Sequence, residues 1–351
     1  MSLPSSSLRR RAAAAVSLAA AAALALTGCG GQGEKAAGDT KAGSGGDKKA
    51  VAQGGKEFAD AAAKTAAFGT TAPAGRFPRT VTHAMGTTEL KAAPKRVVVL
   101  DVGELDNVVS LGMQPVGYAP SEGDEGIPDY LKKDAGEPKS VGTINNLNLE
   151  AINALKPDLI LGSQLRAADK YDALSKIAPT VFSIRPGFPW KENYLLNAAA
   201  LDKTAEAKAK LAAYQAKAAK LGADIGETKP TVTMLRYMPG KTRLYAGASF
   251  IGTILKDSGI PRPQNQQAED LAVEISPERM DEAAADWIFT GVYGPKDKTK
   301  RDSAEGNPLW KGLDAVKQGR AKDVPDETWY LGLGVTAADK VLDDLRGFLA
   351  R

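Results

Sequence analysis

The sequence predicts an α/β protein of two lobes with mostly parallel sheets, joined by one long helix. Three observations support this prediction. Apolar runs typical of strands alternate with helical patterns from residue 80 onward, one segment recurs at an offset of 128 residues, and a helical stretch of about 22 residues separates the two halves. Alternating strands and helices are typical of parallel sheets covered by helices. The 351 residues also suffice for two lobes that each bury a core.

The N-terminal lobe is predicted over residues 80–203. The run at 96–100 follows Pro94 and is rich in valine, which is typical of a strand buried on both faces. By the same reasoning we expect further strands at 116–118, 159–162 and 180–184, and helices at 104–111, 149–155 and 171–177.

The C-terminal lobe, over residues 226–351, repeats this alternation. We expect strands at 231–235 and 287–289, and helices at 250–258, 277–284 and 335–349. Between the lobes, residues 204–225 are rich in Ala, Lys and Leu and contain no Pro. A helix of this length would extend roughly 33 Å, enough to cross from one lobe to the other. The alternative is a surface helix within one lobe.

The recurring segment covers residues 148–160 and 276–288. In each copy a glutamate, Glu150 or Glu278, opens a short helix, and an aspartate eight residues later precedes a strand. The helix dipole and capping geometry favour a Glu in a first helical turn. That explains each Glu singly, but not why both occupy the same place in the two halves.

The N-terminus is predicted to be an export signal. Residues 1–28 contain Arg9, Arg10 and Arg11, followed by an Ala/Leu run too short to span a bilayer comfortably. The run ends in Leu-Thr-Gly before Cys29, which resembles a bacterial lipobox whose cysteine is lipidated; the alternative is an ordinary secretory cleavage site. Residues 29–79 are predicted to be a flexible tether, because most of them are small or charged. We expect the folded body to begin near Thr80.

Composition excludes several classes of site. One Cys excludes a disulfide framework and CxxC metal or redox sites, and one His excludes a multi-histidine metal centre. The sequence has 46 Lys+Arg and 42 Asp+Glu, so its net charge is +4. This small positive charge does not indicate a nucleic-acid-binding protein. The 43% of hydrophobic and 25% of charged residues are typical of a globular domain.

Four segments resemble one family. Residues 80–86 (TVTHAMG), 94–100 (PKRVVVL), 149–160 (LEAINALKPDLI) and 177–181 (IAPTV) are similar to iron-siderophore ABC transporter substrate-binding lipoproteins. The resemblance implies the class III periplasmic binding protein fold, in which two Rossmann-like lobes joined by a rigid helix hold the ligand in the cleft between them. It also implies a monomeric, non-enzymatic protein without cofactor, anchored at the outer face of the cell membrane, whose partner is an ABC permease. The Ala-rich composition favours the actinobacterial type.

The ligand implied by this resemblance, a ferric siderophore, suggests which residues bind it. The siderophore itself ligates the iron, so the protein needs guanidinium groups for the oxygens and aromatic faces for the scaffold. In α/β lobes such groups are expected just after strands. The candidates are Arg185, Arg236, Trp329, Arg166, Tyr237, Trp190, Tyr330, Tyr293, Asn146 and Arg243.

The same resemblance gives Glu150 and Glu278 a second role. In the superfamily, one surface Glu of each lobe docks on the permease subunits. Among ligands, we favour a hydroxamate siderophore, because linear and cyclic trihydroxamates are common in the organisms that this composition suggests.

Three other functions were considered. A cobalamin- or haem-binding protein of the same superfamily is the main alternative, although the lone His83 lies too close to the tether to serve as a haem ligand. A secreted hydrolase is disfavoured because the sequence lacks the G-x-S-x-G, H-E-x-x-H and P-loop motifs. A purely structural envelope lipoprotein does not account for the repeat.

Overall fold

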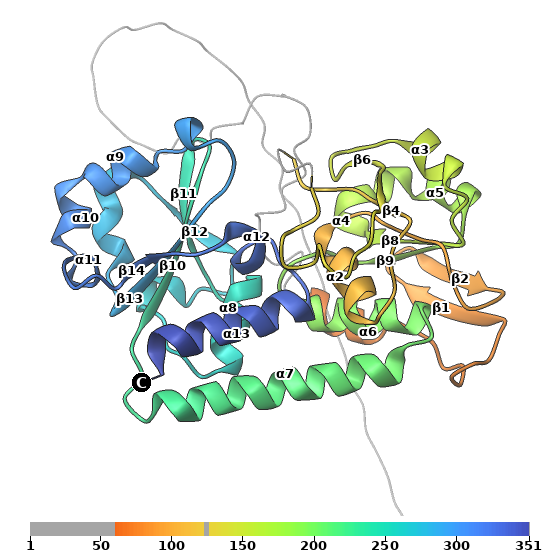
Figure 1. Cartoon of the computed structure of the whole chain (residues 1–351), viewed down its shortest axis with the longest axis horizontal. Helices are drawn as coiled ribbons and strands as arrows, with labels where there is room; N and C mark the ends of the chain where they lie inside the picture. The colour runs from red at the N-terminus through yellow and green to blue at the C-terminus, as the bar shows by residue number, and fades with distance from the viewer. Residues whose placement is uncertain (1–59, 123–125, 351) are drawn as a thin grey trace, which may run out of the picture. The chain divides into compact units, whose positions relative to one another are not determined.

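The structure is a computed structural model that describes residues 60–122 and 126–350 (Figure 1), all within one compact unit. The predicted signal peptide, Cys29 and most of the predicted tether lie outside the described residues. Two five-stranded sheets form the centres of two α/β lobes. The α/β fold class is as predicted, although each sheet has more strands than the sequence led us to expect. Within the described residues, no helix combines the length and hydrophobicity needed to cross a membrane.

The N-terminal sheet is parallel throughout. Its strand order is β5-β4-β3-β8-β9, from Lys139–Ser140, Gly117–Tyr118, Val97–Val99, Leu159–Ser163 and Thr180–Ser183. Strands β3, β8 and β9 are buried along their whole length, which fits their continuous apolar sequence. The helices of this lobe are α2 (Val102–Ser110), α3 (Leu149–Ala154), α4 (Gln164–Ala167), α5 (Tyr171–Ile177) and α6 (Trp190–Ala200).

The C-terminal sheet is mixed, where we expected a mostly parallel one. Its order is β12-β11-β10-β13-β14, from Ala272–Ile275, Lys241–Tyr245, Val232–Met238, Trp287–Val292 and Ala321–Asp323. Strands β10, β13 and β14 are parallel, whereas β11 is antiparallel to both β10 and β12. A tight turn through Pro239 and Gly240, with Gly240 at φ 77°, makes β10 and β11 a hairpin.

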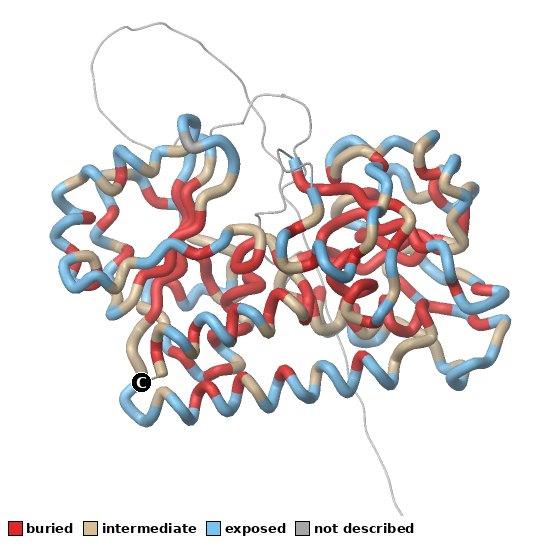
Figure 2. Tube along the Cα trace, in the orientation of Figure 1, coloured by how far each residue is buried: buried red, intermediate tan, exposed pale blue. Residues whose placement is uncertain are grey.

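Helix α7 (Thr204–Ile225) runs beneath both sheets beside α13 (Val335–Leu349), as Figure 1 shows. Its buried residues Ala207, Tyr214, Ala218 and Leu221 recur at helical spacing and form one apolar stripe. They belong to a single core that also takes in α6, α8 (Phe250–Asp257), α13 and both sheets. Figure 2 shows these buried segments continuing between the lobes.

The folded body begins before Thr80. Helix α1 (Ala61–Ala66) packs against α6 and buries Ala61 and Thr65. Strands β1 (Arg79–His83) and β2 (Gly86–Leu90) then form a hairpin. The buried Arg79 explains the earlier start, because its guanidinium donates to the Pro73 and Ala199 carbonyls and to Asp202.

The repeated segment has the same role in both lobes. Asp158, just before β8, accepts the backbone N–H groups of Lys95 and Arg96 at 2.8 Å, at the entrance to β3. Asp286, just before β13, accepts the N–H of Thr231 at 2.7 Å, at the entrance to β10. The helical parts differ, because α3 is α-helical whereas η3 (Pro277–Ala283) is a 3-10 helix interrupted at Arg279.

The remaining short elements lie in connections. They are β6 (Gly142–Thr143), β7 (Asn146–Leu147), η1 (Ala168–Lys170), η2 (Gln264–Gln266), η4 (Lys296–Lys298), α9 (Arg301–Gly306), α10 (Pro308–Gly312), α11 (Asp314–Lys317) and α12 (Asp326–Trp329). Of these, α12 carries residues of the candidate site, as does α4 of the N-terminal lobe.

Candidate functional site

Arg236 is the centre of a buried polar network in the C-terminal lobe. Near the end of β10, its guanidinium is held by both carboxylate oxygens of Asp326 on α12, with Nε 2.6 Å from Oδ1. Nη1 donates to the Tyr245 hydroxyl at 3.0 Å. Burial opposes the positive charge, but Tyr245 and Asp326 outweigh it and raise the pKa of Arg236. The network therefore holds a cation in a fixed orientation.

Two tyrosine rings flank this guanidinium. The Tyr293 ring centre lies 4.6 Å from Cζ of Arg236, and that of Tyr330 lies 5.6 Å away. The Tyr330 hydroxyl lies 2.9 Å from the carbonyl oxygens of Leu235 and Phe289, in the middle of the neighbouring strands β10 and β13. A Cβ on Gly291 would approach the Tyr330 ring to 2.5 Å, so only glycine leaves room for this ring.

The N-terminal lobe has a matching pair, Arg166 and Asp101. Arg166 lies on α4, directly after β8, and its Nε donates to Oδ2 of Asp101 at 2.9 Å. Asp101 follows β3 and caps α2 by accepting the N–H of Val102. Both lobes therefore pair an arginine with an aspartate: Arg166 and Asp101 follow β8 and β3, whereas Arg236 lies within β10 and Asp326 follows the edge strand β14.

Two further ionisable groups, Glu104 and Arg185, lie beside this pair. Glu104, in the first turn of α2, is 3% exposed, and its Oε2 makes no hydrogen bond among the described residues. Burial, and then the charge of Asp101, raise the pKa of Glu104 to about 8. Arg185, two residues after β9, is 1% exposed. Burial, and then the charge of Arg166, lower the pKa of Arg185 to about 10, while Asp270 of the other lobe opposes this shift.

Tyr293 connects the two halves of the site. It follows β13, and its hydroxyl donates to the Glu122 carbonyl of the N-terminal lobe at 2.8 Å. Burial raises the pKa of Tyr293, whereas the charges of Arg236 and, to a smaller extent, Arg166 lower it. Arg166 and Arg236, from opposite lobes, therefore both act on this one tyrosine. The structure thus brings together five predicted residues: Arg166, Arg185, Arg236, Tyr293 and Tyr330.

Trp190 and Trp329 lie in the core instead. Trp190 is fully buried against the rings of Tyr214 and Phe250, and its indole N–H donates to Thr253. Trp329 is fully buried against Phe289 and donates to Asp344 of α13. Both side chains pack as structural residues, and a ligand contact for either stays a prediction.

The other three predicted residues lie outside the network around Arg236 and Tyr293. Tyr237 is buried and, as the next residue of β10, points to the opposite face of the sheet from Arg236. Arg243 is the cross-strand neighbour of Arg236 but forms an ion pair with Glu274 at 2.8 Å. Asn146 is exposed on β7.

Sequence reasoning missed the acidic partners. Asp101 and Asp326 hold two of the arginines, Glu104 lies beside them, and Tyr245 completes the C-terminal network. Asp101 directly follows a predicted strand, so a search for acids as well as bases at strand ends would have found it. Asp326 has no such signal, because β14 was not predicted.

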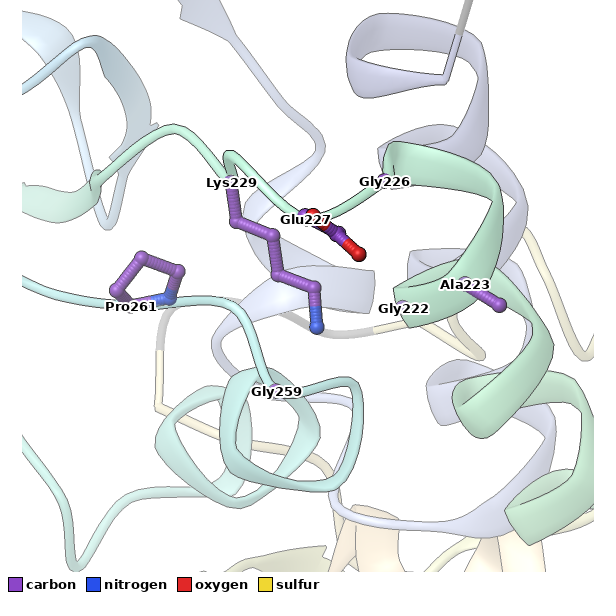
Figure 3. A pocket seen from close by; sticks show the side chains of 7 residues that line it. All are labelled: Gly222, Ala223, Gly226, Glu227, Lys229, Gly259 and Pro261. Atoms are coloured by element: carbon purple, nitrogen blue, oxygen red, sulfur yellow. The ribbon is translucent and has the colours of Figure 1, made fainter.

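A pocket of about 620 Å³ lies away from this site, at the end of α7 (Figure 3). It is lined by Gly222, Ala223, Gly226, Glu227, Lys229, Gly259 and Pro261. Glu227 and Lys229 are its only charged side chains, and none of the predicted ligand residues reaches it. We therefore do not assign ligand binding to this pocket.

The two predicted docking glutamates are exposed, as docking requires. Glu150 lies in the first turn of α3, which Asn148 caps by accepting the N–H of Ala151. Glu278 lies in the matching place on η3, and a hydrogen bond from the Ser276 hydroxyl lowers its pKa. Glu278 therefore remains charged at neutral pH.

The comparisons with known proteins agree with this architecture. The model of a family described as "Periplasmic binding protein" matches residues 97–328. The "Probable siderophore-binding lipoprotein YfiY" of Bacillus subtilis is 37% identical, over 78% of this chain and 88% of the relative. The "Fe(3+)-citrate-binding protein YfmC" of the same organism is 33% identical, over 74% and 82%. The crystal structure of Staphylococcus aureus SirA complexed with staphyloferrin B is 35% identical and matches with a TM-score of 0.70, over 77% of this chain and 98% of SirA.

Proposed function

Because this chain belongs to the periplasmic binding protein family, whose members bind substrates and do not transform them, we propose that it captures a ferric siderophore and delivers it to an ABC importer. The observation that carries the proposal is that Arg166 and Arg236, from opposite lobes, both act on Tyr293, while Arg185 lies close enough to Arg166 for the two charges to interact. The relatives named for siderophore and ferric citrate binding support it.

Within this function we propose an anionic iron chelate as the ligand. The sequence led us to expect a hydroxamate siderophore, but ferric trihydroxamates carry little or no negative charge. Arg185 is buried and Arg166 partly buried, and their guanidinium groups suit carboxylate oxygens better, since arginine pairs well with a carboxylate. The relatives that bind ferric citrate and staphyloferrin B support the carboxylate class. The hydroxamate class remains the alternative.

A titration with three ferric complexes tests both levels of this proposal. The protein without residues 1–28 is titrated by calorimetry with ferric citrate, a ferric trihydroxamate and a ferric tricatecholate. We expect the carboxylate complex to bind tightest, and Arg166→Gln to weaken it about tenfold. Arg301→Gln is the matched control, because Arg301 forms ion pairs with Glu305 and Asp323, away from the site. Tightest binding of the trihydroxamate would restore the hydroxamate class, and no binding by any complex would contradict the function.

We propose that Glu150 and Glu278 dock on the permease. Both are exposed and occupy matching places in the two lobes. Matching places would suit a partner built from two similar subunits. Charge reversal by Glu150→Arg or Glu278→Arg is expected to leave ligand affinity unchanged and to reduce uptake into cells. A loss of ligand affinity in either variant would refute the docking role.

We propose that Cys29 anchors the exported protein to the outer face of the membrane. Relatives described as lipoproteins support this. Cys29→Ala should move the protein from the membrane fraction of cells to the medium, while the ligand affinity of the purified body stays the same. Membrane association of the Ala variant would refute the anchor.

A further inference from the structure

We propose that Asp106 is a positioning residue for the ligand site of the opposite lobe. Asp106 belongs to α2 of the N-terminal lobe, yet it holds the first turn of α13. Through α13 it fixes the segment 326–334, whose residues orient Arg236. This inference rests on the proposed function, because it concerns an arginine that we assign to ligand binding.

The first step is the contact between Asp106 and α13. Asp106 is fully buried, and its two carboxylate oxygens accept the backbone N–H groups of Thr336 and Ala337, each at 3.0 Å. The first N–H groups of a helix have no partner within the helix, and a negative charge is favoured there. The N-cap residue of α13 is Gly334, which has no side chain that could cap the helix. The other lobe therefore supplies the cap.

The second step is the fit around this carboxylate. A Cβ on Gly334 would lie 2.4 Å from Cγ of Asp106, so glycine is required for the contact. The preceding Leu333 has φ 56°, an uncommon conformation for leucine that a tightly packed site can hold in place. The Tyr130 hydroxyl, also from the N-terminal lobe, donates to the Gly332 carbonyl at 3.0 Å. The segment 332–334 is thus held from the N-terminal lobe at several points.

The third step leads from α13 to Arg236. Helices α12 and α13 pack together, and the Trp329 indole donates to Asp344 of α13 at 2.9 Å. Asp326 begins α12 and holds Arg236, while Tyr330 flanks the same guanidinium. Figure 1 places α12 directly above α13, whose first turn points toward the N-terminal lobe. A displacement of the first turn of α13 would therefore move the partners of Arg236.

The titratable groups that act on Asp106 are few. Burial raises the pKa of Asp106 to about 6, against the hydrogen bonds from Thr336 and Ala337. Burial also raises the pKa values of Tyr130 and of Tyr194 on α6, so both stay neutral below pH 9. Protonation near pH 6 removes the negative charge of Asp106 and weakens its hold on two N–H groups.

The decisive variants alter this contact from each side. Asp106→Asn keeps the shape of the side chain but retains only one accepting oxygen, and Gly334→Ala pushes against the carboxylate from α13. We expect each to weaken the affinity for ferric citrate about tenfold, and the double variant to lose less than the product of the two effects. Asp202 likewise accepts hydrogen bonds from a backbone N–H, that of Gly75, and from the guanidinium of Arg79, but it lies away from α13. Asp202→Asn is therefore the matched control. It should lower the melting temperature without changing affinity.

Two further readouts separate positioning from stability. Hydrogen exchange should show faster exchange at Thr336, Ala337 and residues 326–331 in Asp106→Asn than in the control. The affinity of the unaltered protein should fall between pH 7 and pH 5.5 more steeply than that of Asp106→Asn. Unchanged affinity in both folded variants would overturn the inference, as would faster exchange confined to residues 335–338. Should the unaltered protein bind no ferric complex, the proposed function fails, while hydrogen exchange still decides whether Asp106 fixes residues 326–331.

Discussion

Arg236 in the C-terminal lobe and Arg185 in the N-terminal lobe are both buried, yet their surroundings act on the guanidinium charge in opposite directions. Asp326 and Tyr245 stabilise the charge of Arg236 and raise its pKa, whereas burial and the nearby Arg166 lower the pKa of Arg185. The two carboxylates differ in the same way. Asp326 binds its arginine through both oxygens, whereas Oε2 of Glu104 makes no hydrogen bond among the described residues.

This difference indicates that the arginines of the two lobes have different roles, one in stability and one in ligand affinity. The C-terminal lobe presents a cation that is already oriented and neutralised, so an arriving anion gains little new electrostatic stabilisation there. In the N-terminal lobe, burial and then the charge of Arg166 lower the pKa of Arg185. An anionic chelate beside Arg185 would favour its charged form, because an opposite charge nearby offsets burial and the repulsion from Arg166. We therefore expect Arg236 to matter most for stability and Arg185 to matter most for affinity.

The largest expected effect is on stability, from Arg236→Met. This change leaves the Asp326 carboxylate, whose side chain is 12% exposed, without its cationic partner. Removing one partner of a buried ion pair costs about 4 kcal/mol, so the free energy of unfolding should fall by that amount. Urea denaturation at pH 7 measures it. Adding Asp326→Asn to Arg236→Met should recover part of the lost free energy of unfolding. A loss of under 1 kcal/mol in Arg236→Met alone would show that the ion pair between Arg236 and Asp326 is not important for stability.

The second prediction concerns pH and Glu104. Its pKa in the folded state, about 8, lies above its ordinary value of 4.5. The folded state therefore binds this proton more tightly than the unfolded state, and the resulting stabilisation is lost as the pH rises from 4.5 to 8. Glu104→Gln should escape this loss, so its stability relative to the unaltered protein should increase by about 1 kcal/mol per pH unit over that range. Denaturation at several pH values measures the difference, and parallel stability curves would refute it.

The third prediction is the reverse of the first. Arg185→Gln should weaken the affinity for ferric citrate by about 2 kcal/mol, because it removes charged hydrogen bonds to the ligand. Its free energy of unfolding should stay the same or rise, since the charge of Arg185 is disfavoured in the folded protein. Calorimetric titration and urea denaturation of the same sample measure the two effects. A large loss of unfolding free energy in Arg185→Gln would show that Arg185, like Arg236, matters mainly for stability.

The sequence predicted the fold class and the carboxyl edge of the N-terminal sheet, because both follow from local patterns. Valine-rich runs define β3, and the residues after β8 and β9, Arg166 and Arg185, follow from counting along the chain. The C-terminal lobe was harder. Strand β11 is short and carries charged residues at two of its five positions, Lys241 and Arg243, so its hairpin with β10 was missed.

The two tryptophans show why the rest of the site was beyond the sequence. Trp190 and Trp329 follow loops, as ligand contacts do, but tertiary packing places both in the core. Their indole N–H groups find partners on α8 and α13, elements far along the chain. Whether an aromatic side chain packs inward or faces a ligand depends on such long-range contacts, which no local pattern reports.

The smallest expected effect tests where the two lobes are alike. Asp158 and Asp286 occupy matching places in the repeat, and each accepts hydrogen bonds from the start of the neighbouring strand. Replacing either by asparagine removes one accepting oxygen from an exposed site, so Asp158→Asn and Asp286→Asn should each cost about 1 kcal/mol of unfolding free energy. Neither should change affinity for the ferric complex, because both lie before the strands, at the edge opposite the arginines. Equal losses of unfolding free energy in the two variants would support a common structural role for the repeat. A loss of ligand affinity in only one variant would mean that the two lobes also differ at this edge of their sheets.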